Sequence, residues 1–241
     1  MNDSIPPPIA PDHSGSQSVA PSSINSLVSA FEAILREQVR VVLRLTQPGA
    51  GALILRLLAL ALILDLGYGL VVGTFSGGEQ LWVAPLKMSG GLFLSAIICL
   101  PSLYILVCLG GARATVVEVV GLVAGLLALM NILLIGFAPV AWVFSQSTES
   151  ANTMGAMHLF FAYISLYFGL RFVKLGFKTL DGVAVSAPKI WSVVFLLVLL
   201  QMTTSLRPIV GTADTILPTE KKFFLTYWGD CLGWNAPTTG R

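Results

Sequence analysis

Three polar side chains lie inside long apolar stretches, and their chemistry could matter most: Asp65, Asn131 and Gln201. Asp65 falls near the middle of the first stretch, where inserting a carboxylate into a bilayer costs about 2.5–3.5 kcal/mol. It must therefore face protein or water, where it could hold a proton or a small cation. The alternative, which we favour, is a structural carboxylate, protonated or paired with Arg56 or a neighbouring helix. We expect Asn131 and Gln201 to make packing hydrogen bonds.

The sequence offers no set of residues that would build an active site. Its only histidines, His13 and His158, are too few for a histidine-based metal site or catalytic triad. The three cysteines, Cys99, Cys108 and Cys231, form neither a CxxC pair nor a disulfide framework. The chain also lacks a phosphate-binding glycine loop, a dinucleotide fingerprint and an acidic metal motif. We therefore expect a protein that is not an enzyme and has no catalytic residue, metal or cofactor.

The composition indicates a membrane protein. Hydrophobic residues make up 55% of the 241 residues and charged residues 11%, whereas a soluble domain has roughly 25% charged residues. A helix needs about twenty apolar residues to cross a bilayer. The stretches that approach or exceed this length are 52–73, 91–110, 119–148, 157–177 and 189–206. We predict an all-α integral membrane protein, a bundle of about five transmembrane helices over 52–206 with an N-terminal amphipathic helix.

Small residues and prolines within the spans predict how the helices pack. Pro101 lies in the middle of the second span and removes a backbone donor, so we expect a kink there. The third span is about 45 Å long at 1.5 Å per residue, so it should tilt, bend at Pro139 or project beyond the bilayer. Gly121 and Gly125 form a small-xxx-small face that lets another helix approach closely. This face more often serves packing within a chain than dimerisation.

The N-terminal residues divide into a tail and a helix. Residues 1–25 are rich in proline and serine, which predicts a disordered tail and no signal peptide. Residues 26–47 repeat apolar side chains every three or four positions, which predicts an amphipathic helix. Arg36, Arg40 and Arg44 follow another face of this helix. The helix therefore lies on an anionic membrane surface or packs on the protein's own loops, and the sequence favours neither alternative.

The C-terminal tail and the distribution of basic residues predict the orientation. Residues 207–241 contain Lys221 and Lys222 followed by aromatic side chains, which suits a short helix at the membrane surface. Basic residues in short loops gather on the cytoplasmic side. In a five-span chain, the loops on the side of the N-terminus hold Arg113, Arg171, Lys174, Lys178 and Lys189. The loops on the opposite side, which include residues 74–90, hold only Lys87. We therefore expect a cytoplasmic N-terminus and a C-terminus on the opposite side, in the cell membrane if the source is bacterial.

The order of these elements resembles that of Yip1-type five-span membrane proteins. The similarity covers roughly residues 50–210, in an amphipathic lead-in, short connections, a proline within the second span and a long third span. Its most local feature is the stretch Leu100-Pro101-Ser102-Leu103-Tyr104. The resemblance implies a role in organising membranes or as a trafficking adaptor, and it assigns no functional residue.

Two functions remain for this sequence. The first, which we favour, is a non-enzymatic membrane-organising protein or accessory subunit of a membrane complex. The alternative is a small ion-coupled transporter or channel subunit that uses Asp65. The expected partners are the lipid bilayer and other membrane-protein subunits. Nucleic acid is not expected, because a net charge of +2 gives no support to nucleic-acid binding.

Overall fold

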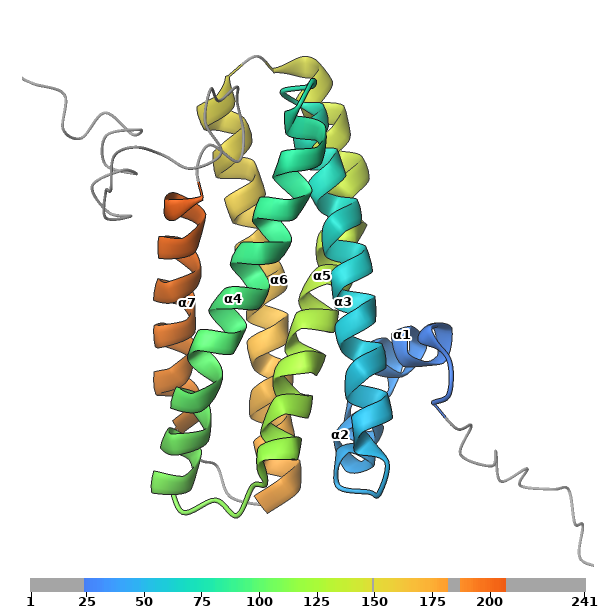
Figure 1. Cartoon of the computed structure of the whole chain (residues 1–241), viewed down its shortest axis with the longest axis vertical. Helices are drawn as coiled ribbons and strands as arrows, with labels where there is room; N and C mark the ends of the chain where they lie inside the picture. The colour runs from blue at the N-terminus through green and yellow to red at the C-terminus, as the bar shows by residue number, and fades with distance from the viewer. Residues whose placement is uncertain (1–23, 149, 182–186, 207–241) are drawn as a thin grey trace, which may run out of the picture.

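The computed structural model describes residues 24–148, 150–181 and 187–206, and all regular elements in these ranges are α-helices. In chain order they are α1 (Leu27–Arg36), α2 (Gln38–Leu45), α3 (Ala50–Thr74), α4 (Gln80–Leu109), α5 (Val116–Ser147), α6 (Ala151–Asp181) and α7 (Ala187–Ser205). Helices α3 to α7 are each long and apolar enough to cross a membrane, which confirms the predicted all-α five-span bundle (Figure 1). Lys221 and Lys222, predicted to lie at the membrane surface, are outside the described residues.

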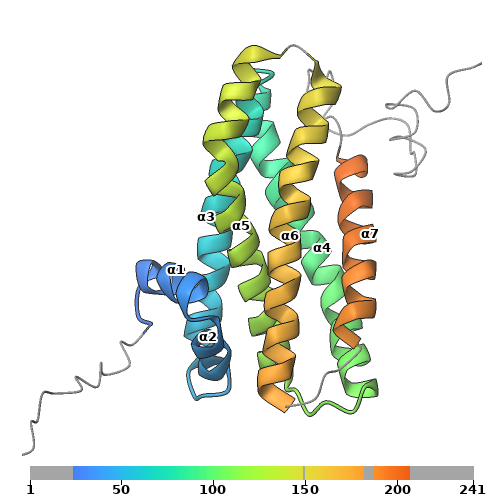
Figure 2. The same cartoon turned by 180° about the vertical axis from the view of Figure 1, so that it is seen from behind.

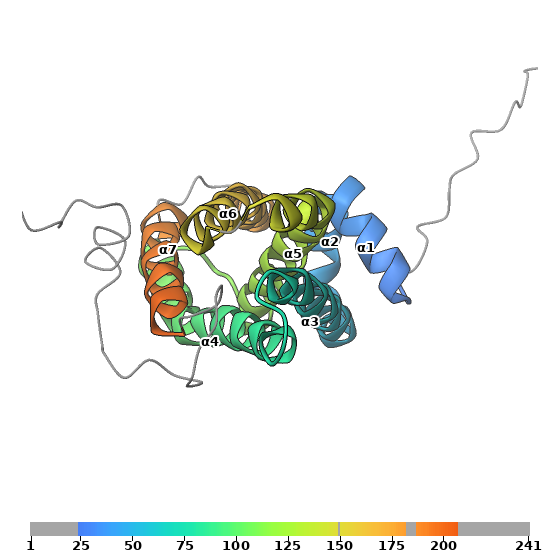
Figure 3. The ribbon, with the colours of Figure 1, turned by 90° about the horizontal axis from the view of Figure 1, so that it is seen from above.

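Helix α5 is the centre of the bundle. In the most apolar stretch of α5, 78% of the residues are buried. In the corresponding stretches of the other four spans, the share of buried residues is between 28% and 33%. Helices α3 and α6 pack against α5, α4 packs against α3, and α7 packs mainly against α4 (Figure 3). Seen from behind, α6 runs between α5 and α7 (Figure 2). The outer faces of the spans carry exposed leucine, isoleucine, valine and phenylalanine side chains, as surfaces that meet lipid must.

The second span begins earlier than the sequence predicted. Residues 74–90 were expected to form a loop, but α4 starts at Gln80 and continues through Gly90 and Gly91. A glycine ends a helix most readily when it adopts a left-handed conformation. Gly77 and Gly78 do so, with φ of 65° and 55°, whereas Gly90 and Gly91 do not have positive φ. Lys87 consequently lies within a span and is only 6% exposed, so the expectation that it sits in an outside loop is wrong.

The predicted packing residues lie within continuous helices. Pro101 is inside α4 and Pro139 is inside α5, and both helices extend beyond them. Each of the two predicted glycines faces a side chain from another helix. A Cβ atom at Gly121 would lie 2.5 Å from Leu45 of α2, and one at Gly125 would lie 2.3 Å from the Phe172 ring of α6. Both glycines therefore leave space for a side chain within the same chain.

The predicted helix over 26–47 is two helices rather than one. Ser26 starts α1 by accepting a hydrogen bond from the Ser29 amide at 3.0 Å. Glu37 interrupts the helix with φ −129° and ψ 51°, so α2 runs in a different direction from α1 (Figure 1). Gly49, with φ 87°, then turns the chain into α3. The break could not be predicted, because the periodicity of apolar residues continues across Glu37.

Candidate functional site

Asp65 is enclosed between α3 and α4. Its side chain is 1% exposed. Gly69, one turn further along α3, lets α4 approach, because a Cβ there would lie 2.5 Å from the Cα of Pro85. One turn beyond Pro85, the Ser89 hydroxyl comes beside the Asp65 carboxyl, although not in the geometry of a hydrogen bond. The close contact of α3 and α4 thus places a serine at the predicted carboxylate.

Arg56 is not the partner of Asp65. Its guanidinium donates a hydrogen bond to the Ile24 carbonyl at 2.6 Å, which ties the start of α3 to the residues before α1. Within the described residues, the ion pairs join Arg36 with Glu32 and Arg40 with Glu37, all four outside the spans. The pairing of Asp65 with Arg56, one of the structural alternatives that the sequence left open, is therefore wrong.

Tyr68 and His158 form a second buried polar pair next to Asp65. The Tyr68 hydroxyl lies 2.8 Å from His158 Nδ1, so α3 and α6 share a hydrogen bond. The two rings meet edge to face, with centroids 5.7 Å apart. Tyr68 is 1% exposed, and it lies on the same face of α3 as Asp65 because the two are three residues apart. That spacing was the available signal for this pair, and the sequence interpretation did not use it.

Asn131 and Ser165 add polar atoms from α5 and α6. Both side chains are fully buried. The Asn131 amide nitrogen donates to the Leu127 carbonyl of its own helix at 3.0 Å, and its carbonyl oxygen has no partner within the described residues. Ser165 follows His158 by seven residues, so both lie on one face of α6. Among the described residues, the hydrogen bond that Asn131 makes is thus within its own helix rather than to another helix.

Five buried side-chain atoms in the described chain have no hydrogen-bond partner. They are Asp65 Oδ2, Ser89 Oγ, Asn131 Oδ1, His158 Nε2 and Ser165 Oγ. We call these five residues the polar layer. They come from α3, α4, α5 and α6.

The heights of these residues follow from contacts between the helices. Gly69 touches Pro85, Gly67 faces Ile135, and Tyr68 bonds His158, which sets the register of α4, α5 and α6 against α3. At 1.5 Å per residue, the whole polar layer then spans about 10 Å along the bundle. His158 and Ser165 mark its two ends, and the other three members fall between them.

The atoms of the polar layer are ones that need hydrogen-bond partners. A buried polar atom without a partner costs about 1–3 kcal/mol, and Asp65 and Ser89 are close enough to supply a partner to each other. Partners that are not part of the chain, such as ordered water or a bound ion, would remove this cost. Four of the five atoms are oxygens, the type of ligand that hard cations prefer.

Gln201 is not a member of the polar layer. It lies half-buried on α7, a helix that packs mainly on α4. The indole N–H of Trp191 fixes α7 by donating to the Cys99 carbonyl of α4 at 2.9 Å. The structure thus brings Asp65 and Asn131 to similar heights within helices α3 to α6, whereas Gln201 lies on α7, outside that group of helices.

The sequence did not identify Ser89, His158 and Ser165 as site residues, because serine and histidine in a span give no distinctive pattern.

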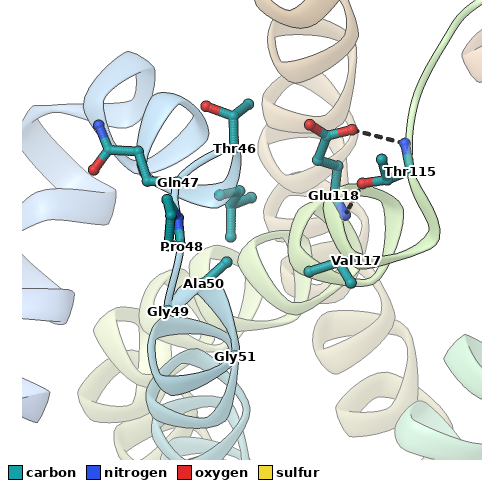
Figure 4. Close-up of a pocket in the computed structure, with 10 residues that line it drawn as sticks. Thr46, Gln47, Pro48, Gly49, Ala50, Gly51, Thr115, Val117 and Glu118 are labelled. Atoms are coloured by element: carbon teal, nitrogen blue, oxygen red, sulfur yellow. Dashed lines mark hydrogen bonds between the residues drawn. The ribbon is translucent and has the colours of Figure 1, made fainter.

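A surface pocket lies at the end of the bundle where α3 and α5 begin (Figure 4). It is lined by the turn from Leu45 to Gly51 and by Thr115, Val117 and Glu118. Thr115 and Glu118 satisfy each other in a capping box: the Thr115 amide donates to Glu118 at 2.7 Å, and the Glu118 amide donates to Thr115 at 3.3 Å. Because these groups are already paired, the pocket offers less to a ligand than the polar layer does.

Comparison of the chain with protein-family models, curated proteins and solved structures finds no match. The resemblance to Yip1-type proteins therefore stays an expectation.

Proposed function

We propose that the protein is a small ion-coupled transporter or channel subunit, in which Asp65 and the polar layer bind a monovalent cation or a proton. The observation that carries this proposal is the burial of Asp65 at mid-span, with the Ser89 hydroxyl beside it and without a pairing arginine or lysine in the described chain. A carboxylate at this depth is stable only when its charge is neutralised. An exchangeable cation does this where no fixed basic residue does.

The donor atoms of the polar layer suit such a ligand. Carboxylate, hydroxyl and amide carbonyl oxygens are the kind of ligand that hard cations bind. His158 Nε2 adds a nitrogen that can accept a proton when Nδ1–H donates to the Tyr68 hydroxyl, and this hydrogen bond also holds the ring in place. These ligands are divided among four helices, so binding would change how the helices pack. This division is what coupling between ion and conformation requires.

Uptake of radioactive sodium into proteoliposomes tests the proposal. We expect uptake by the wild-type chain that exceeds that of empty liposomes, and its loss in Asp65→Asn. A pH-sensitive dye inside the same vesicles reports proton movement in parallel. Ser102→Ala is the matched control, because Ser102 also lies in α4 but bonds the Cys99 carbonyl of its own helix. Equal fluxes in wild type and folded Asp65→Asn would contradict the proposal.

A second candidate is the membrane-organising or accessory-subunit role. The observation that favours it is the pair α1 and α2, which packs on the side of the spans and leaves a row of large apolar side chains exposed. A surface of this kind contacts lipid or another protein. Co-purification of other membrane proteins with the wild-type chain in mild detergent, lost when Val28 and Leu43 are changed to aspartate, would favour this role.

A further inference from the structure

Helix α1 has three distinct faces. The face that packs on the bundle consists of Ala30, Ala33 and Ile34. The exposed apolar row consists of Leu27, Val28, Phe31 and Leu35, with exposed fractions between 37% and 75%. The charged face carries Glu32 and Arg36, an exposed ion pair at 3.8 Å. Because each residue advances about 100° around the axis, the apolar row lies between the buried face and the charged face.

Helix α2 repeats the same order of faces. Its buried residues are Val41, Val42 and Leu45. Its exposed apolar residues are Val39 and Leu43, at 45% and 48%, and from here on the exposed apolar row includes them with the four residues of α1. Arg40 and Arg44 form the charged face, with Glu37 and Gln47 at its ends. Around the axis the order is again buried, apolar, charged, in the same sense as in α1. Two helices separated by a break at Glu37 therefore share one pattern.

The two helices are fixed to the spans. Leu45 fills the space left by Gly121 on α5, and the Arg56 guanidinium of α3 holds the Ile24 carbonyl just before α1 at 2.6 Å. Helix α1 also packs against α5, and α2 packs against α6. The exposed apolar row is consequently held in a set orientation relative to the bundle rather than free to turn inward.

Helices α1 and α2 lie beside the N-terminal part of α3, the part where this span begins (Figure 1). The spans have 19 to 32 residues, and the longer ones exceed the roughly twenty that cross the hydrocarbon. Their ends therefore reach the headgroup region. A helix with an apolar row beside a charged face lies in that region, with the apolar row in the acyl boundary and the charges in water.

The charges of α1 and α2 argue against a strong attraction of these helices to anionic lipid. Residues 24–47 contain three arginines and two glutamates, so the net charge is +1. Arg36 and Arg40 each have a glutamate within 4.0 Å, at 3.8 Å and 2.6 Å. The exposed apolar row, in contrast, contains six large side chains. Insertion of this row, rather than attraction by the arginines, is therefore the larger contribution.

We propose that α1 and α2 form an interfacial platform that embeds the apolar row of both helices in the leaflet at the N-terminal end of α3. The occupant of this surface is phospholipid, and neutral phospholipid suffices. This inference is independent of the ion-coupled function, because it uses none of the residues of the polar layer.

Spin-label accessibility on the full chain tests the platform. The native cysteines are replaced by alanine, and a nitroxide is attached at Val28 or Leu43 in the apolar row, or at Glu32 or Arg44 on the charged faces as matched controls. In phosphatidylcholine vesicles we expect collisions with oxygen, relative to a water-soluble nickel chelate, to be several-fold higher at Val28 and Leu43 than at Glu32 and Arg44. Adding phosphatidylglycerol should change this ratio little.

Two results would overturn the proposal. Equal accessibility to the nickel chelate at all four positions means that the row stays in water. Protection of Val28 and Leu43 from both oxygen and the chelate means that protein covers the row. If the cysteine-free chain does not fold, a phosphatidylcholine with a photoreactive acyl chain labels the wild-type chain instead. Labelling at Val28 and Leu43 but not at Glu32 then supports the platform, and its absence contradicts it.

Discussion

The polar layer and the interfacial platform contain similar residue types in opposite settings. On the platform, charged side chains are exposed and pair within one helix, as Glu32 does with Arg36, and such pairs contribute about 0–1 kcal/mol. In the polar layer, Asp65 is buried with an unpartnered oxygen, and each such atom costs about 1–3 kcal/mol. Removing one charge from the platform should therefore change the stability little, whereas an unpartnered polar atom of the layer lowers the stability more.

The largest effect should follow from changing the carboxylate itself. If sodium binds Asp65, a concentration of 100 times Kd stabilises the protein by about 2.7 kcal/mol. Asp65→Asn should lose this increase in Tm, measured in detergent with choline chloride replacing sodium chloride. Ser102→Ala should keep it. A sodium-dependent Tm that survives in Asp65→Asn would place the ion elsewhere.

Gly121→Val should have the next largest effect. It tests whether the interfacial platform and the polar layer are independent of each other. Its new side chain would overlap Leu45, and such overpacking costs about 1–3 kcal/mol. We expect a lower Tm and increased proteolysis between α1 and α2, with an unchanged sodium response. Gly136→Val is the control, because nothing lies within 4 Å of a Cβ at that position of α5. Loss of the sodium response in Gly121→Val would show that platform and layer are coupled.

The sequence predicted the features that depend on a single helix. It placed Asp65 at mid-span and facing inward, and it predicted five spans from hydropathy and length. It did not predict which residues meet across helices. Ser89 reaches Asp65 because Gly69 admits Pro85, a contact that depends on the register of α3 and α4. The start of α4 was missed because Gly90 and Gly91 resemble a helix end and yet keep negative φ.

Tyr68→Phe should have a smaller effect within the polar layer. It removes the hydrogen bond to His158 Nδ1 and leaves the ring packing in place, at a cost of about 1 kcal/mol. We expect a modest decrease in Tm, together with weaker sodium stabilisation because the His158 ring is no longer held. Tyr163→Phe is the control, since Tyr163 on α6 is 60% exposed. Identical behaviour of the two variants would remove Tyr68 from the site.

Arg44→Gln should have the smallest effect. One basic residue near an anionic leaflet contributes about 1 kcal/mol at most. We expect a slight loss of depth for the Val28 spin label in vesicles with phosphatidylglycerol and none in phosphatidylcholine. A complete loss of membrane contact in both would show that the arginines, rather than the apolar row, hold the platform on the membrane.

The most direct test of the cation site is an experimental structure of the protein prepared with thallium(I) in place of sodium, because thallium gives a strong anomalous signal. If the polar layer binds a cation, an anomalous peak appears among Asp65, Ser89 and Asn131 in the wild-type crystal, and none appears in Asp65→Asn. A well-ordered map without an ion or water at this level, with the five polar atoms bonded directly to one another, would contradict it.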